Sequence, residues 1–169
     1  MTIRIGILTL SDRSSRGERT DASGPALADL VRAQGWSVAE QAILADDESA
    51  IRAKLSAWAD GGKLDVILTT GGTGFALRDV TPEATRAIVH REAPGLAEAM
   101  RAESLKKTPH AMLSRGMAGI RGRTLIVNLP GSPKGAVENL QTILPVLPHA
   151  VQLLKDDPDS EASHSSAPA

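Results

Sequence analysis

The sequence predicts a three-layer α/β fold in which helices cover both faces of a mostly parallel sheet. Short runs rich in Val, Ile and Leu alternate along the chain with longer segments whose apolar residues recur at helical spacing. Glycine and proline mark the junctions between the two kinds of segment. Strands buried on both faces read as continuous apolar runs, and their alternation with helices is typical of a parallel sheet.

The N-terminal half contains three of the four expected strands. Each is an apolar run followed by polar or glycine-rich residues. Two segments between these runs carry apolar side chains on one helical face and end at glycine. In chain order, the expected elements are a strand over 3–10, a polar loop, a helix that Ser23 and Pro25 start and Gly35 ends, a strand over 38–44, a helix over 48–59 and a strand over 66–70.

Prolines set the element boundaries in the C-terminal half, because proline is well suited to the first turn of a helix and interrupts its interior. The fourth strand is another buried apolar run. In chain order, the expected elements are two helices within 82–107 that break at Pro94-Gly95, a strand over 124–129, a helix from Ser132-Pro133 and a short helix that ends at Leu154.

One domain over residues 1–155 and an acidic tail over residues 156–169 account for the composition. The chain has 169 residues, of which 41% are hydrophobic and 23% charged, as in an ordinary globular domain. The tail has four acids and no Lys or Arg, so the first 155 residues carry 19 bases against 16 acids. We expect the tail to be disordered, because it lacks apolar residues to bury.

Several classes of protein are disfavoured by the same composition. The chain has no cysteine, which excludes disulfides and thiolate metal sites. It has neither an apolar run of membrane-spanning length nor the features of a signal peptide, so we expect a cytoplasmic protein without membrane contact. The small basic excess and the 2% aromatic content argue against nucleic-acid binding. The histidines lack metal-ligand spacing, and His90 is expected at the surface.

The segment LTTGGTGFALRDVTPEAT, residues 68–85, has the features of a phosphate-binding loop. Its three glycines have no Cβ and let backbone amides approach a ligand. Thr81-Pro82 predicts a hydroxyl cap and a first-turn proline at the start of a helix, whose amino end favours anions. The segment matches neither the dinucleotide-binding fingerprint nor the P-loop. The alternative is an ordinary glycine-rich turn between a strand and a helix.

Polar residues follow each of the four predicted strands. They are Ser11-Asp12, Asp46-Asp47, the glycine loop and the run from Asn128 to Gly131. Ligands of such sheets bind at the carboxyl ends of the strands, so we expect the four loops to converge. The sequence therefore predicts a site for a phosphorylated small molecule.

Three segments, GGTGFALRDVTPEAT, AMLSRGMAGIRG and LIVNLPGSPKG, resemble the molybdopterin adenylyltransferase family and occur in the same order. The likeness covers about residues 3–155, and the same domain is also found fused in proteins such as gephyrin. The resemblance implies the molybdenum cofactor biosynthesis domain fold, usually as a homotrimer. It also implies transfer of AMP from ATP to the terminal phosphate of molybdopterin, with release of pyrophosphate and hand-off of the product to a molybdenum-inserting enzyme.

Asp79 is the first candidate for a catalytic residue, and Asp46 is the second. A carboxylate beside a phosphate-binding loop can hold Mg²⁺, which bridges phosphate oxygens in phosphoryl-type transfer. We therefore expect both aspartates to be metal ligands. Alternatively, Asp79 pairs with Arg78 or caps the following helix, and Asp46 is a helix N-cap. Asp47 is the weaker candidate of the adjacent pair.

Substrate binding is predicted for residues of all four loops, and the resemblance adds Glu92 and Ser114. Phe75 is expected to pack in the core, with contact to a pterin or adenine ring as the alternative. The arginines at 13, 16 and 19 either face the ligand or belong to a solvated loop. The predicted substrate-binding residues are Ser11, Asp12, Thr70, Gly71, Gly72, Thr73, Gly74, Arg78, Glu92, Ser114, Pro130, Gly131 and Ser132.

Two other functions are compatible with these observations. A molybdopterin-binding paralogue would keep the site but have weak or no transferase activity. A scaffold module would use the fold for assembly, as the domain does when fused in gephyrin. Release of pyrophosphate from ATP in the presence of molybdopterin distinguishes the enzyme from both.

Overall fold

The computed structural model describes residues 2–155 and contains a six-stranded sheet with the strand order β2-β1-β3-β6-β5-β4. Four strands, β1 (Arg4–Leu10), β2 (Ser37–Leu44), β3 (Val66–Thr70) and β6 (Thr124–Leu129), are parallel. An antiparallel edge of β5 (Ala118–Arg121) and β4 (Arg91–Glu92) follows β6. The predicted mostly parallel sheet is confirmed.

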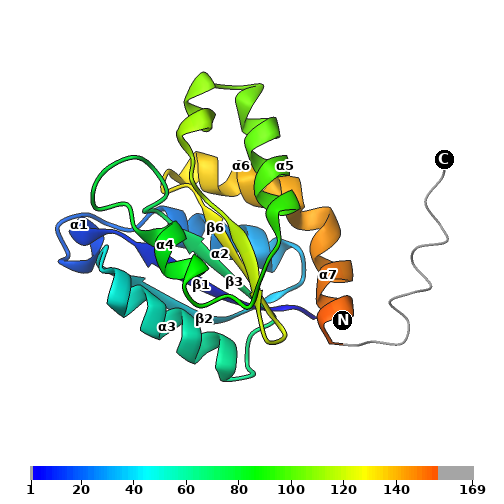
Figure 1. The fold of residues 1–169 in the computed structure, drawn as a ribbon. Coiled ribbons are helices and arrows are strands. Elements are labelled where there is room, and N and C mark those ends of the chain that lie inside the picture. The colour runs from blue at the N-terminus through cyan, green and yellow to red at the C-terminus, as the bar shows by residue number, and fades with distance from the viewer. Residues whose placement is uncertain (1, 156–169) are drawn as a thin grey trace.

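Helices cover both faces of the sheet and give the predicted three layers (Figure 1). One face is covered by α2 (Ser23–Ala33), α5 (Pro94–Leu105), α6 (Pro133–Ile143) and α7 (Leu147–Leu154). The other face is covered by α3 (Glu48–Asp60) and α4 (Thr81–Arg86). The shorter turns are α1 (Asp12–Ser15), η1 (Pro109–Leu113) and η2 (Leu144–Val146).

Buried side chains of the central strands alternate between two apolar clusters. In β1, Ile5 and Ile7 pack with α2 and α6, whereas Leu8 and Leu10 pack with α3 and α4. A strand that is buried on both faces has no need of polar residues at alternate positions. This two-sided burial explains the continuous apolar runs in the sequence.

The structure corrects the predicted elements in three places. The edge strands β4 and β5 were not predicted, because they are short and depend on pairing more than on composition. The first helix predicted within 82–107 ends at Arg86, although the second does begin at the expected break, Pro94. The expected polar loop after β1 contains the single turn α1.

A buried hydrogen-bond network fixes α4 to the sheet. Asn128 Nδ2 donates to Thr69 Oγ1 at 3.0 Å and to Thr85 Oγ1 at 2.9 Å, which links β6 to β3 and α4. The Met117 N–H donates to Asn128 Oδ1 at 3.3 Å. Buried polar groups that are fully paired give a core a unique arrangement. These bonds therefore fix α4, the helix that follows the glycine loop, to the sheet.

Asp65, whose side chain is 1% exposed, anchors the amino ends of the strands to the end of α7. Arg4 donates to Asp65 through its backbone N–H and its guanidinium, both at 2.8 Å, and Lys155 Nζ lies 3.0 Å from the same carboxylate. Burial alone would raise the pKa of Asp65, but the bonds from Arg4 and Lys155 outweigh it and lower that pKa. The cluster lies at the amino edge of the sheet.

The predicted tail over residues 156–169 lies outside the described residues. Within the part of the chain that the structure describes, every helix falls short of the length and apolar character that crossing a bilayer requires.

Candidate functional site

A cavity of about 370 Å³ opens at the carboxyl ends of β1 and β3. The loops after β1, β2, β3 and β6 all contribute to its walls, so the four polar strand ends do meet. The lining includes Thr9, Ser11, Ser14, Arg19, Asp21, Asp46, Thr70, Gly71, Gly72, Asp79, Gly131 and Ser132.

Gly71 and Gly72 adopt left-handed backbone conformations, with φ of 101° and 66°. Such values favour glycine. A Cβ on Gly71 would collide with the carbonyl oxygen of Leu10, and a Cβ on Gly72 would collide with Thr81 Oγ1. Contacts within the protein therefore require these two glycines, in addition to any demand that a ligand makes.

The expected hydroxyl cap of α4 is not formed. Thr81 is the first residue of the helix, and Val80 occupies the N-cap position without a side-chain bond. Instead, the buried Thr81 Oγ1 donates to the Gly71 carbonyl at 2.9 Å, and the Thr81 N–H donates to the Gly72 carbonyl at 3.1 Å. Thr81 thus ties the glycine loop to the start of α4, and Pro82 lies in the first turn as predicted.

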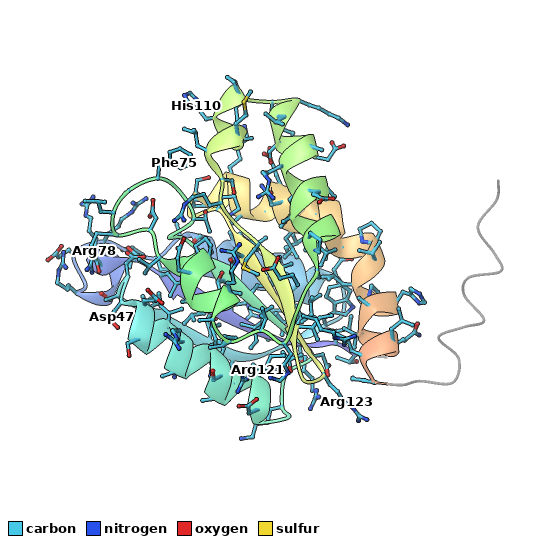
Figure 2. All side chains as sticks on the ribbon, viewed as in Figure 1. Asp47, Phe75, Arg78, His110, Arg121 and Arg123 are labelled. Atoms are coloured by element: carbon cyan, nitrogen blue, oxygen red, sulfur yellow. The ribbon has the colours of Figure 1, made fainter. Side chains whose placement is uncertain are left out.

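Arg78 pairs with Asp12 and not with Asp79. Its Nε donates to Asp12 Oδ2 at 2.8 Å and its Nη2 donates to Oδ1 at 2.7 Å. These bonds from Arg78, helped by the backbone N–H of Asp46, lower the pKa of Asp12. Figure 2 shows Arg78 and Asp47 on the same side of the molecule. The pair joins the segment after the glycine loop to the loop after β1, next to the cavity.

Asp46 lines the cavity and has one carboxyl oxygen without a hydrogen-bond partner among the described residues. Its Oδ2 accepts the Asp12 N–H at 3.1 Å, but its buried Oδ1 has no hydrogen-bond donor among residues 2–155. Burial raises the pKa of Asp46, and the carboxylates of Asp12 and Asp79 act in the same direction. The N-cap alternative applies to its neighbour, since Asp47 Oδ1 accepts the Ala50 N–H at 2.8 Å.

Asp79 is held by its own loop. Its Oδ2 accepts the Ala76 N–H at 2.9 Å, and its backbone N–H donates to the Ala76 carbonyl at 2.9 Å. It does not cap α4, whose N-cap is Val80. Both alternatives to a functional Asp79, pairing with Arg78 and capping, are therefore wrong.

The predicted metal ligands Asp46 and Asp79 both line this cavity. Asp21 lines it too, but both of its carboxylate oxygens accept hydrogen bonds from the protein. Within residues 2–155, no three His, Cys, Asp or Glu side chains are grouped as a metal site. Mg²⁺ usually binds through one or two carboxylates together with substrate phosphates and water. A buried carboxylate oxygen without a donor, in a residue that shares a cavity with a second carboxylate, fits a site of that kind.

A second cavity of about 320 Å³ lies on the other side of the glycine loop, between that loop, α5, η1 and α6. The predicted residues Thr73, Gly74, Ser114 and Pro130 line this cavity, and Ser132 lines both cavities. The glycine loop and Ser132 therefore form a wall between two adjoining spaces. Ten of the thirteen predicted substrate-binding residues line one or both of these cavities, whereas Asp12, Arg78 and Glu92 line neither.

Besides Asp12 and Arg78, which pair with each other, two further residues lie elsewhere than predicted or apart from the cavities. Glu92 belongs to β4 and pairs with Arg86 at 3.1 Å, away from both cavities. Phe75 was expected in the core but is 67% exposed. Figure 2 shows it on the loop after the glycines. The exposed position of His90 is confirmed.

Sequence reasoning missed several lining residues. Ser14 from the loop after β1 lines the first cavity and was not predicted. Arg19 lines it as well, which agrees with the first of the two alternatives left open for the arginines of that loop. Arg101, Lys107 and His110 line the second cavity. They come from α5 and the residues after it, which reach the site only because α5 packs on α6. No local pattern in the sequence shows that packing.

The fold and the two adjoining cavities define an α/β protein that binds small ligands at the carboxyl ends of its strands. A family model described as "probable molybdopterin binding domain" matches residues 6–149, and the chain belongs to that family. The family predicted from the three sequence segments is therefore confirmed.

Named relatives cover nearly all of the chain. It is 48% identical over 160 residues to the molybdenum cofactor synthesis protein cinnamon of Drosophila melanogaster, covering 92% of this chain but only 26% of cinnamon. It is 44% identical over 155 residues to the molybdopterin adenylyltransferase of Helicobacter pylori strain J99, covering 90% of this chain and 88% of that protein.

The fold is shared with solved structures. The molybdopterin biosynthesis enzyme MoaB of Thermus thermophilus superposes with a TM-score of 0.87 at 54% identity, covering 93% of this chain and 99% of that chain. The predicted fold class is confirmed.

Proposed function

We propose that the protein is a molybdopterin adenylyltransferase, which transfers AMP from ATP to the terminal phosphate of molybdopterin and releases pyrophosphate. The observation that carries the proposal is the pair of cavities separated by the glycine loop and Ser132, since the reaction needs two substrates side by side. The 44% identity to a relative that bears this name supports it.

The reaction requires positioning and charge neutralisation more than covalent help from the protein. An oxygen of the molybdopterin phosphate attacks the α-phosphorus of ATP, and the bond from that phosphorus to the pyrophosphate oxygen breaks. No protein nucleophile is needed, and the chain contains no cysteine that could serve as one. Ser132, which lines both cavities and caps α6, lies where the two substrates would meet.

Asp46 and Asp79 would hold Mg²⁺, which supplies positive charge against the phosphate oxygens when bound. The buried Oδ1 of Asp46 supports this role, because a cation would satisfy an oxygen that residues 2–155 leave without a donor. Arg19 adds a cation to the same wall, and the amino end of α6, capped by Ser132, adds a partial positive charge. Arg19 and the amino end of α6 both favour an anionic ligand.

The proposal includes a homotrimer in the cytoplasm that hands its product to a molybdenum-inserting enzyme. The homotrimer and the hand-off rest on the resemblance to the family, and the cytoplasmic location rests on the composition of the chain. Sedimentation equilibrium measures the trimer directly, and a monomer at micromolar concentration would remove it from the proposal.

The test is pyrophosphate release from ATP and Mg²⁺ with and without molybdopterin. Release that depends on molybdopterin, together with adenylylated molybdopterin as the product, is the expected result. Molybdopterin binding without release would identify a binding paralogue. Failure to bind either substrate would leave a scaffold module as the function.

A further inference from the structure

We propose that Arg115 is a positioning residue that holds residues 74–79, the site loop, and thereby sets the place of Asp79 at the first cavity. The inference rests on the proposed function, since it gives Asp79 a part in AMP transfer. It is carried by the hydrogen bonds of one guanidinium group.

Arg115 reaches both ends of the site loop. Its Nε donates to the Gly74 carbonyl at 2.8 Å, and its Nη2 donates to the Asp79 carbonyl at 2.6 Å. Its Nη1 bonds to Glu83 in the first turn of α4, and its backbone N–H donates to the Thr73 carbonyl at 2.8 Å. Arg115 thus bonds to both ends of the site loop and to the residues on either side of it.

The Asp79 carboxyl depends on this arrangement. Asp79 and Ala76 are joined by two hydrogen bonds within the loop, so the turn and the carboxyl group move together. The turn is joined to the body of the protein through the Asp79 carbonyl, which Arg115 holds. Loss of the Arg115 bond would leave the internal turn formed but free to shift.

A second arginine also joins the site loop to the rest of the described chain, but it is the weaker link. Arg78 pairs with Asp12 from a side chain that is 64% exposed, whereas the Arg115 side chain is 35% exposed. Solvent-exposed ion pairs contribute little to stability. Arg115 also uses two backbone carbonyls as acceptors, and these are fixed in position by the chain itself.

Lysine could not replace these contacts. The planar guanidinium presents several donors in a fixed fork, whereas a lysine ammonium is a single point of charge on a flexible stem. At most one or two of the three acceptor groups would remain bonded. Arg115→Lys therefore keeps the positive charge but removes the fixed arrangement of hydrogen-bond donors.

Arg121 provides a matched control. It also bonds a carboxylate and a carbonyl, with Nε and Nη2 donating to Asp60 and Nη1 donating to the Ile88 carbonyl at 2.8 Å. Figure 2 shows it at the end of the molecule away from Arg78 and Phe75. Arg121→Lys removes the same kind of fork without touching the site loop.

Limited trypsin digestion tests whether Arg115 holds the loop, because Arg78 is a cleavage site within it. Fragments 1–78 and 79–169 are quantified by mass. We expect cleavage after Arg78 to be at least about fivefold faster in Arg115→Lys than in the wild type, and within about twofold of the wild type in Arg121→Lys. An unchanged rate in Arg115→Lys would overturn the proposal.

Pyrophosphate release tests whether the loop acts through Asp79. We expect Arg115→Lys to lower kcat by at least about tenfold and to change the KM for ATP by less than about threefold, since positioning affects the transition state more than binding. In an Asp79→Asn background the same substitution should cost no more than about twofold, because residues that act as a unit are not additive. Fully additive losses would overturn the role through Asp79.

The two assays separate the possible failures. If the wild-type protein releases no pyrophosphate from ATP and molybdopterin, the proposed function fails, and trypsin digestion alone decides whether Arg115 holds the loop. If digestion responds as expected but kcat does not, Arg115 is structural only and the positioning role is wrong.

Discussion

Asp46 and Asp79 line one cavity but are held in different ways. Asp79 accepts an N–H from its own loop, so its direction is fixed by that turn. Asp46 has a buried oxygen without a donor among the described residues, and burial raises its pKa. A carboxylate that lowers the stability of the isolated protein but could bind a cation is typical of a functional site. The two substitutions should therefore differ in their effects on stability.

Asp79→Asn should keep the fold and lose most AMP transfer. The amide oxygen of Asn can still accept the Ala76 N–H, so the turn survives while the negative charge is lost. Loss of a group that stabilises the transition state typically lowers kcat by about 10²–10³-fold. Pyrophosphate release and thermal unfolding together check this. Wild-type turnover would show that Asp79 is not a catalytic residue.

Asp46→Asn should raise the melting temperature at pH 7 while lowering AMP transfer. Because the folded pKa of Asp46 is raised, the ionised carboxyl costs the wild-type fold stability at neutral pH. As the pH falls through that raised pKa, the folded wild type takes up a proton before the unfolded chain does and regains this stability. The advantage of the variant, about 1–4 °C at pH 7, should therefore shrink on acidification. A constant difference from pH 7 to about pH 4 would contradict this account.

Arg19→Ala should raise the KM for ATP by about tenfold, equivalent to about 1.4 kcal/mol. Arg19 lines the first cavity, where it would meet phosphate oxygens. Arg13→Ala is the matched control, because Arg13 belongs to the same loop but does not line either cavity. Equal effects of the two substitutions on KM would indicate a general charge effect of the loop.

At the scale of elements, the site is a loop held between a strand and a short helix. β3 delivers the two left-handed glycines, and Thr81 of α4 bonds to both of their carbonyls. The network around Asn128 then ties α4 to the sheet. The conformation of the loop is therefore set by elements on both sides of it, before any ligand binds.

Gly72→Ala should destabilise the protein more than Gly62→Ala. Both glycines have similar left-handed backbones, with φ of 66° and 67°, so both substitutions carry a strain of about 1–2 kcal/mol. A Cβ on Gly62 meets nothing within 4 Å, whereas one on Gly72 would collide with Thr81 and lie 3.1 Å from Asp46 Oδ1. Chemical denaturation measures the difference, and isothermal titration with ATP and Mg²⁺ measures the added loss of binding. Equal unfolding free energies would refute the collision.

The sequence was informative where an element is defined by its own composition. The four parallel strands and the glycine loop follow from apolar runs and from residue types with local backbone preferences. The strands β4 and β5 could not be predicted, because β5 is a strand through its pairing with β6 and β4 through its pairing with β5. The wall formed by α5 and η1 was missed for a similar reason, and Phe75 was placed in the core on its hydrophobicity although its loop projects outward.

At the scale of the whole molecule, the cavities and the Asp65 cluster lie at opposite edges of the sheet. Both cavities open at the carboxyl ends of the strands, and their lining residues fall between Thr9 and Asn139. The Asp65 cluster joins the start of β1 to the end of α7 at the opposite edge. Among the described residues, the walls of the site are therefore formed well apart from the Asp65 cluster.

Deleting residues 157–169 should leave turnover and solution mass unchanged. The truncation keeps Lys155 and its contact with Asp65, and it keeps every described residue that lines either cavity. The deleted acids would weakly repel ATP, and this repulsion is screened beyond about 8 Å at physiological salt. Pyrophosphate release and light scattering on both chains provide the comparison. An inactive or dissociated truncated protein would assign the tail a part in the site or the assembly.

The Asp65 cluster also makes the protein well suited to immobilisation. Arg4 and Lys155 both bind Asp65, so a tag or linker joined directly before Thr2 or directly after Lys155 would start from the same edge of the molecule. A protein coupled to a sensor surface through such a tag would keep the mouths of both cavities toward the solution. Nucleotide and pterin binding could then be measured on the fixed molecule without the surface competing for the entrance.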